Sequence, residues 1–325
     1  MISRAIASVL ILILIVTGPV SAQDSIAEPR DVKVGLLLTN LTEVNGAEQS
    51  ISADVVMIAS WSDPALADST SGARTLPLND VWHPTLVIYN QLKVRESMPY
   101  EVTVQPDGTV TYLQRFTGQF STPMDLRQFP RDEQEFHVWL VSPALVATDI
   151  RLLLEHRMPT LRAENLSISD WTVGELSLTE QTLQIAPGAA VNPGVKLTIP
   201  AQRLMTYYWI QVLIPLVAII LMAYTVFWIA PTVVPTRIGV VVTTMLTLIA
   251  YRFMLANHVP RLPYLTRLDW FMLGGTVLVL LTLFTMAGTS YLVSNGQDAV
   301  VKKIDRAGRV LYPAVFVVFS LIVWL

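Results

Sequence analysis

The sequence predicts an all-β, immunoglobulin-like sandwich of about ten strands followed by an α-helical four-helix transmembrane bundle. Three observations carry this prediction. The chain is 52% hydrophobic with only 14% charged residues, outside the usual composition of a soluble protein. Short alternating segments occupy residues 23–203, whereas four long apolar segments occupy residues 204–325. Acidic residues outnumber basic residues before Arg203, and the balance reverses after it. We therefore expect the two parts to lie in different environments.

Residues 1–22 have the pattern of a secretory signal peptide. Arg4 supplies the positive charge, residues 5–16 are largely apolar, and Val20-Ser21-Ala22 fits a cleavage site. An uncleaved membrane anchor is the alternative. The chain contains no cysteine, so disulfides and thiolate metal sites are excluded. We expect a multi-pass protein of the cell (inner) membrane, with residues 23–203 extracellular or periplasmic.

The N-terminal part contains segments that alternate or run apolar between turn residues, which is the pattern of short strands. Residues 106–108, Pro-Asp-Gly, predict a hairpin turn, because Pro presets one backbone angle and Gly accepts a positive one. The predicted strands are Val32–Leu41, Ile51–Trp61, Leu86–Tyr89, Tyr100–Val104, Thr109–Phe116, Gln134–Val141, Asp149–Glu155, Asp170–Leu178 and Val195–Pro200. Their spacing predicts an antiparallel sandwich.

Each of the four apolar segments has about the length that a helix needs to cross a bilayer. They cover residues 205–229, 236–257, 268–292 and 309–325. An exported N-terminus and four crossings place the linker 293–308 in the cytoplasm. Lys302, Lys303 and Arg306 in this linker agree with the positive-inside tendency.

The second apolar segment carries a stripe at helical spacing that starts with a small residue and contains a hydroxyl, a large aliphatic group and an amide. The stripe consists of Gly239, Thr243, Leu246, Ala250, Phe253 and Asn257. Threonine and asparagine are unfavourable on a surface that faces lipid. They suit a water-filled pore, in which the large aliphatic side chain would form a hydrophobic constriction. The alternative is a buried helix whose hydroxyl groups bond neighbouring helices.

Several motifs in the mature chain resemble those of bacterial pentameric ligand-gated ion channels, which are relatives of the Cys-loop receptors. Residues 122–136, TPMDLRQFPRDEQEF, resemble the signature loop that holds Phe-Pro-x-Asp between two cysteines in animal members. Thr122 and Phe136 stand where those cysteines would be. The further matches are Trp61-Ser62-Asp63, Trp82-His83-Pro84, residues 106–116, the Arg203 junction, Pro215 and residues 259–264.

The resemblance implies a homopentamer around a central pore, embedded in membrane lipid and conducting inorganic ions. Each subunit would offer its second crossing to the pore, so Leu246 would form a ring of five side chains. Such a ring stops ions by dewetting and opens when the helices tilt or rotate outward. We therefore expect Leu246 to be the gate.

The selectivity of the pore is expected to depend on its cytoplasmic mouth. Pro235, Thr236 and Arg237 are similar to the Pro-Ala-Arg pattern of glycine- and GABA-type anion channels, and no carboxylate occurs in residues 230–237. Helix N-termini and arginines favour anions there, so we expect chloride preference. The alternative for Arg237 is that it turns away from the lumen and anchors the helix. Cation selectivity stays open, because the acidic outer part would concentrate cations.

Coupling between the sandwich and the membrane helices is expected at the loops that meet near Arg203. The resemblance pairs Arg203 with acidic groups of the first two of these loops. The candidate residues on the sandwich side are Glu43, Glu48, Asp125, Phe129, Pro130 and Asp132. On the membrane side they are Pro260, Arg261, Pro263 and Tyr264.

The stimulus is the part that the sequence defines least. Tyr89 matches the first tyrosine of the aromatic cage that binds amines in animal receptors, but the other cage positions are not aromatic here. Protons are a second candidate stimulus, with His258 beside the outer loop as sensor and His83, His137 and His156 as further candidates. Small-molecule agonists, acids or amines, stay open.

Other function classes find less support in the residues. No nucleophile motif, histidine pair or carboxylate pair for an enzyme is present, and no cofactor or metal is expected. The acidic, exported part disfavours nucleic acid. A membrane-anchored sandwich that senses or binds without conducting is the remaining alternative, but it leaves the polar stripe unexplained.

Overall fold

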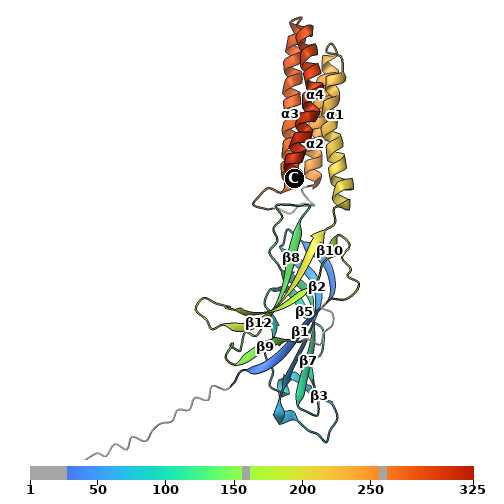
Figure 1. The fold of residues 1–325 in the computed structure, drawn as a ribbon. Coiled ribbons are helices and arrows are strands. Elements are labelled where there is room, and N and C mark those ends of the chain that lie inside the picture. The colour runs from blue at the N-terminus through green and yellow to red at the C-terminus, as the bar shows by residue number, and fades with distance from the viewer. Residues whose placement is uncertain (1–27, 156–161, 256–261) are drawn as a thin grey trace, which may run out of the picture.

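The computed structural model describes residues 28–155, 162–255 and 262–325. A β-sandwich and a helical bundle lie end to end, and the C-terminus lies at the end of the bundle nearest the sandwich (Figure 1). The chain completes the sandwich before it enters the bundle, so one covalent connection, at Arg203, joins the two parts.

The sandwich consists of a seven-stranded and a five-stranded sheet. The first has the order β3-β6-β7-β2-β1-β9, with β5 also paired to β7; the second has the order β10-β12-β8-β4, with β11 also paired to β12. The strands of the first are β1 (Arg30–Asn45), β2 (Ser50–Ser62), β3 (Arg74–Pro77), β5 (Gln91–Glu96), β6 (Glu101–Val104), β7 (Thr109–Ser121) and β9 (Ile150–Leu154). Those of the second are β4 (Val87–Ile88), β8 (Glu133–Val141), β10 (Trp171–Val173), β11 (Ser177–Leu183) and β12 (Asn192–Arg203). Short 3-10 turns occur at Pro64–Leu66 (η1) and Leu78–Asp80 (η2).

Alternating burial along the central strands builds the sandwich core. In β8, Phe136, Val138 and Leu140 are fully buried, while the residues between them are exposed or half-buried. In β2, Val55 and Met57 are fully buried with the same alternation. A period of two is what a sheet with one buried face requires, which confirms the predicted sandwich.

The structure differs from the predicted strands in three places. Strands β3 and β5 were not predicted, since β3 has only four residues and ends in proline, and β5 has only Leu92 and Val94 as apolar residues and is largely exposed. The segment predicted as one strand at 170–178 is divided into β10 and β11, because their registers on β12 differ by one residue: Val173 pairs with Ala201, whereas Ser177 pairs with Thr198. The predicted hairpin is confirmed: Gly108 has a φ of 81° and Asp107 accepts a hydrogen bond from the Thr109 N–H at 2.9 Å.

The described part of the chain contains four spans that are long and apolar enough to cross a membrane. The first consists of a π-helix η3 (Tyr208–Leu213), α1 (Ile214–Tyr224) and a 3-10 turn η4 (Thr225–Trp228). The other three are α2 (Val234–Leu255), α3 (Arg267–Ser294) and α4 (Asp298–Trp324). Helix α3 starts with a capping box in which Thr266 and Asp269 bond each other's backbone N–H.

Helix α4 starts well before the expected position 309, so most of the expected linker 293–308 is helical. Its charged first half packs on the bundle: Val301, Asp305 and Tyr312 are buried on one face. Gly308 lies so close to the first span that an added Cβ would be 2.3 Å from the Phe227 ring. Small residues permit such close approach of membrane helices.

Candidate pore helix and domain junction

One face of α2 is exposed on the subunit surface, and it carries the stripe identified in the sequence. Gly239, Thr243 and Ala250 are exposed, and so are the large side chains of Leu246 (62%) and Phe253 (73%). Asn257 lies outside the described residues. Two bulky apolar side chains and a hydroxyl therefore face away from the subunit's own bundle.

The opposite face of α2 packs on the other helices. Val241, Thr244, Leu248 and Leu255 are buried there. The Thr244 hydroxyl donates to the Val240 carbonyl at 2.8 Å, so this hydroxyl needs no water. Hydroxyl groups thus occur on both faces: that of Thr244 on the buried face, and those of Thr243 and Thr247 on the exposed face, where Thr247 donates to the Thr243 carbonyl at 2.8 Å.

The N-terminal end of α2 exposes Pro235 and Thr236 but not Arg237. The Arg237 guanidinium is buried and forms an ion pair with Asp305 of α4. The expectation that this arginine adds positive potential to the pore mouth is therefore not supported, because the side chain turns into the bundle and its charge is balanced. The alternative, that Arg237 turns away from the lumen, agrees with this burial, but the sequence could not indicate the partner Asp305, since it lies on another helix.

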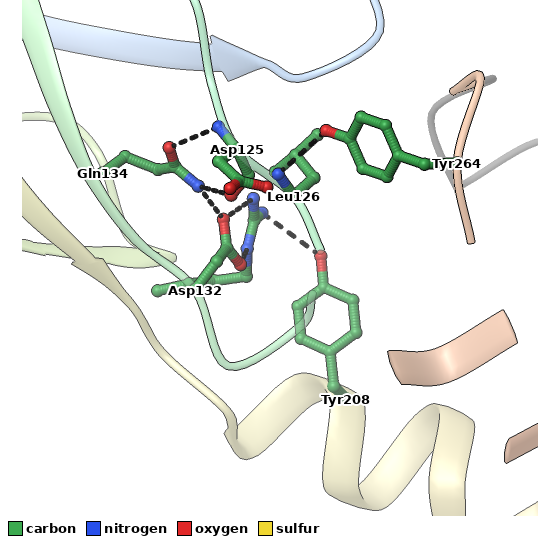
Figure 2. A network of polar contacts seen from close by, with 7 residues as sticks. Asp125, Leu126, Asp132, Gln134, Tyr208 and Tyr264 are labelled. Carbon is green, nitrogen blue, oxygen red and sulfur yellow. Dashed lines mark hydrogen bonds and ion pairs between the residues drawn. The ribbon is translucent and has the colours of Figure 1, made fainter. Parts of the chain in front are cut away.

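The junction between sandwich and bundle centres on a second buried ion pair, between Arg203 at the end of β12 and Asp132. Arg203 Nε and Nη2 bond the two Asp132 carboxylate oxygens at 2.7 and 3.1 Å. Gln134 donates to the same carboxylate at 2.9 Å and also bonds the Asp125 backbone, which fixes the loop (Figure 2). Two charge-assisted bonds in a fork geometry fix direction as well as distance.

Three aromatic rings surround the Arg203 guanidinium. Its central carbon lies 4.2 Å from the Trp171 ring centroid, 5.0 Å from Phe129 and 5.8 Å from Tyr208. Burial opposes the charge of Arg203, but the Asp132 carboxylate more than offsets it, so the pKa of Arg203 lies above its ordinary value. Arg203 stays charged and fixed at the point where the chain enters the first span.

The loop of Asp132 also contacts the start of α3. The Leu126 N–H donates to the Tyr264 hydroxyl at 3.1 Å (Figure 2), and Arg127 lies over the Tyr264 ring at 5.1 Å. The Arg267 N–H donates to the Arg127 carbonyl at 3.0 Å. One sandwich loop is therefore bonded to both the first and the third span.

The remaining coupling candidates contribute less in the structure. Glu43 and Glu48 are exposed, and neither forms an ion pair within the described residues. We expected Arg203 to pair with acidic groups of two loops, but the structure shows an ion pair with Asp132 of one loop. Asp125 forms an exposed ion pair with Arg127 at 3.0 Å. Pro130 and Phe129 are buried in the junction loop, whereas Pro263 is exposed. Pro260 and Arg261 lie outside the described residues. Trp171, Gln134 and Tyr208 also contact the Arg203–Asp132 pair, but no local pattern in the sequence predicts this.

The region of Tyr89 carries a cation of its own. Tyr89 is 48% exposed, and its N–H donates to the Trp139 carbonyl on the neighbouring strand β8. Trp139 pairs in turn with Lys196 on β12, whose ammonium lies 5.2 Å from the indole ring. An aromatic face already covered by a lysine is poorly suited to binding an amine.

His137 lies beside this group, on the same strand as Trp139. Burial, and then the charge of Lys196, lower its pKa below the ordinary value. Its Nδ1 atom is buried without a hydrogen-bond partner. His258 lies outside the described residues, and no cluster of metal-binding side chains occurs among those that are described. Within the part of the chain that the structure describes, His137 is therefore a histidine whose surroundings penalise a proton.

Comparison with known proteins places this geometry in a family. Residues 18–193 match the model of the neurotransmitter-gated ion-channel ligand-binding domain, and residues 212–299 match the model of the transmembrane region. A "Proton-gated ion channel" of Gloeobacter violaceus is 24% identical over 335 aligned positions, covering 98% of this chain and 91% of that protein. The gamma-aminobutyric acid receptor subunit beta-4 of Gallus gallus is 25% identical over 281 positions, covering 81% of this chain but 56% of that protein.

Both domain models match in the order in which they follow each other along the chain, with the four membrane-spanning helices after the N-terminal ligand-binding domain. That domain is extracellular or periplasmic, as in the membrane-embedded relatives. The chain belongs to the neurotransmitter-gated ion-channel family of the Cys-loop receptor superfamily.

Proposed function

We propose that the chain assembles into a homopentameric ion channel whose pore is lined by the exposed stripe of α2. The observation that carries this proposal is the division of α2 into two faces: Gly239, Thr243, Leu246, Ala250 and Phe253 are exposed, while the opposite face packs on the bundle. A five-fold ring closes when each subunit contacts the next with the same pair of surfaces. Asn257 would extend the lining at the outer end.

The gate of this pore is Leu246. It is the most exposed aliphatic side chain near the middle of α2, and five such side chains around an axis exclude water from a narrow passage. Thr243 precedes it by about one helical turn and supplies a hydroxyl that water or a permeating ion can contact.

We infer a preference for anions, with chloride as the expected ion, from the mouth of the pore. Pro235 and Thr236 are exposed, residues 230–237 contain no carboxylate, and the free N–H groups of the α2 N-terminus point toward the mouth. The ion pair of Arg237 with Asp305 leaves little net charge from either. Helix dipoles alone then set the preference, so it should be weak and easily reversed.

Replacement of Thr236 by Glu adds one carboxylate per subunit at this mouth, where residues 230–237 otherwise contain none. We expect the reversal potential of wild-type channels in liposomes or planar bilayers to be displaced from zero toward the chloride potential in a sodium chloride gradient. Thr236→Glu should move the reversal potential toward sodium, because a carboxylate ring attracts cations. Thr236→Gln is the control for size. A wild-type reversal potential that tracks sodium would contradict the inferred anion preference, and an absence of any conductance would contradict the channel itself.

The Arg203–Asp132 ion pair is proposed to couple the sandwich to the pore. Removal of one partner leaves a buried charge without compensation, which costs about 3–5 kcal/mol. Arg203→Ala should therefore abolish stimulated current or pentamer assembly, as measured by current and by size-exclusion chromatography. Arg151→Ala breaks the exposed Arg151–Asp31 pair between β9 and β1, outside the junction, and should change little, since surface pairs contribute roughly 0–1 kcal/mol. Normal stimulated currents from Arg203→Ala would refute the coupling role.

We propose protons as the stimulus, with His137 as one of the groups that respond. The bacterial relative is named a proton-gated ion channel, which favours protons as the stimulus. The Lys196 ammonium over the Trp139 ring argues against an amine as the agonist. Because the pKa of His137 is lowered in the described conformation, this conformation is favoured above the ordinary histidine value and loses stability as pH falls through the lowered pKa. Acidification therefore drives the chain toward a conformation in which His137 is better solvated.

Replacement of His137 by Gln removes this titration while retaining a polar side chain. In a pH series from 4 to 9 without added ligand, we expect the half-activation point of His137→Gln to move to more acidic pH by roughly half a unit or more. His83→Gln is the control, since His83 bonds only the carbonyl of nearby Val81. Identical activation curves for His137→Gln and wild type would exclude His137 as a sensor, and currents that do not vary with pH would exclude proton gating.

A further inference from the structure

The first membrane span has an irregular stretch where it leaves the sandwich. Tyr208–Leu213 form a π-helix, in which the Ile214 N–H reaches back to the Trp209 carbonyl. Pro215 follows at the start of α1 and has no N–H to donate. The carbonyl of Gln211, one α-helical turn earlier, therefore loses its ordinary helical donor.

The pore helix supplies the missing donor. The hydroxyl of Tyr251 on α2 lies 2.8 Å from the Val212 carbonyl and 3.2 Å from the Gln211 carbonyl. A phenol has one proton, so the two carbonyls share it, and each carbonyl has lone pairs to accept it. Tyr251 is half-buried and comes from the flank of α2, not from the exposed stripe.

The same π-helix is also held from the sandwich. Tyr208, its first residue, packs edge-on against Phe129 with ring centroids 5.1 Å apart. Its hydroxyl accepts a hydrogen bond from Arg203 at 3.4 Å (Figure 2). A segment of six residues is thus bonded to the junction at its start and to the pore helix near its end.

We propose that Tyr251 is a positioning residue for gating: its hydroxyl fastens the pore helix to the π-helix at the proline, so that displacement of the junction moves α2. This inference rests on the proposed channel function. A helix that lacks one backbone bond bends there more easily than a regular helix does. Without another contact at the Gln211 carbonyl, the helix would bend at Pro215 and movement at Arg203 would not reach the rest of the bundle. The Tyr251 bond passes that movement to α2, about one and a half turns beyond Leu246.

The test is a double-mutant cycle between Tyr251→Phe and Pro215→Ala. Tyr251→Phe removes the hydroxyl and keeps the ring, so pentamers should form and conduct, but activation should need a roughly three- to tenfold stronger stimulus, the shift of equilibrium expected for one membrane hydrogen bond. In the Pro215→Ala background the new N–H serves the carbonyl, and the effect of Tyr251→Phe should fall below about twofold. Tyr291→Phe, on an exposed tyrosine of α3, is the matched control and should not shift activation.

The cycle is measured on two quantities, the stimulus for half-activation and the thermal midpoint of the purified pentamer. The thermal cycle does not require conductance, so it tests the hydrogen bond even if the proposed function fails. Pro215→Gly supplies the same N–H if Pro215→Ala yields no protein. The proposal is overturned if Tyr251→Phe activates like wild type. It is equally overturned if the effect of Tyr251→Phe is the same size with and without Pro215.

Discussion

A membrane interior offers no water to polar groups, and this constraint determines how the described structure is arranged from Arg203 to the C-terminus. Thr244 bonds its own helix, and Tyr251 bonds the carbonyls beside Pro215. Arg237 is neutralised by Asp305. The hydroxyls of Thr244 and Tyr251 and the charge of Arg237 are thus satisfied inside one subunit, although the Arg237 Nε atom is buried without a hydrogen-bond partner among the described residues. Thr243, on the exposed face, lies next to Leu246, and the proposed pore gives this face the water that lipid cannot.

Two buried ion pairs act at opposite ends of the bundle. Arg203 and Asp132 hold the first span to the sandwich, while Arg237 and Asp305 hold the start of α2 to α4. A buried pair is expensive to desolvate and costly to break, so each fixes a geometry more than it adds stability. The sandwich and the pore helix are therefore connected through fixed points, with the π-helix of the first span between them.

The sequence predicted the features that depend on local pattern. Alternation in β2 and β8 and the Pro106–Gly108 turn determine the sandwich, and hydropathy determines the spans. It did not predict β3 and β5, which are short and have few apolar residues, or the early start of α4, whose charged residues do not have the hydropathy of a membrane span. The partners of Arg237 and Tyr251 were equally hidden, because each lies on a different helix and is brought close only by packing.

Cysteine accessibility at two adjacent threonines of α2 tests most directly whether the Thr243 face of this helix lines a water-filled pore. The chain has no native cysteine, so Thr243→Cys and Thr244→Cys each introduce a single thiol in closely matched positions. If this face lines the pore, a charged, water-soluble thiol reagent should modify the cysteine at position 243 and reduce the current. The cysteine at the buried position 244 should be protected. Protection of position 243 under every condition, or equal modification of both, would contradict a pore lined by this face of α2.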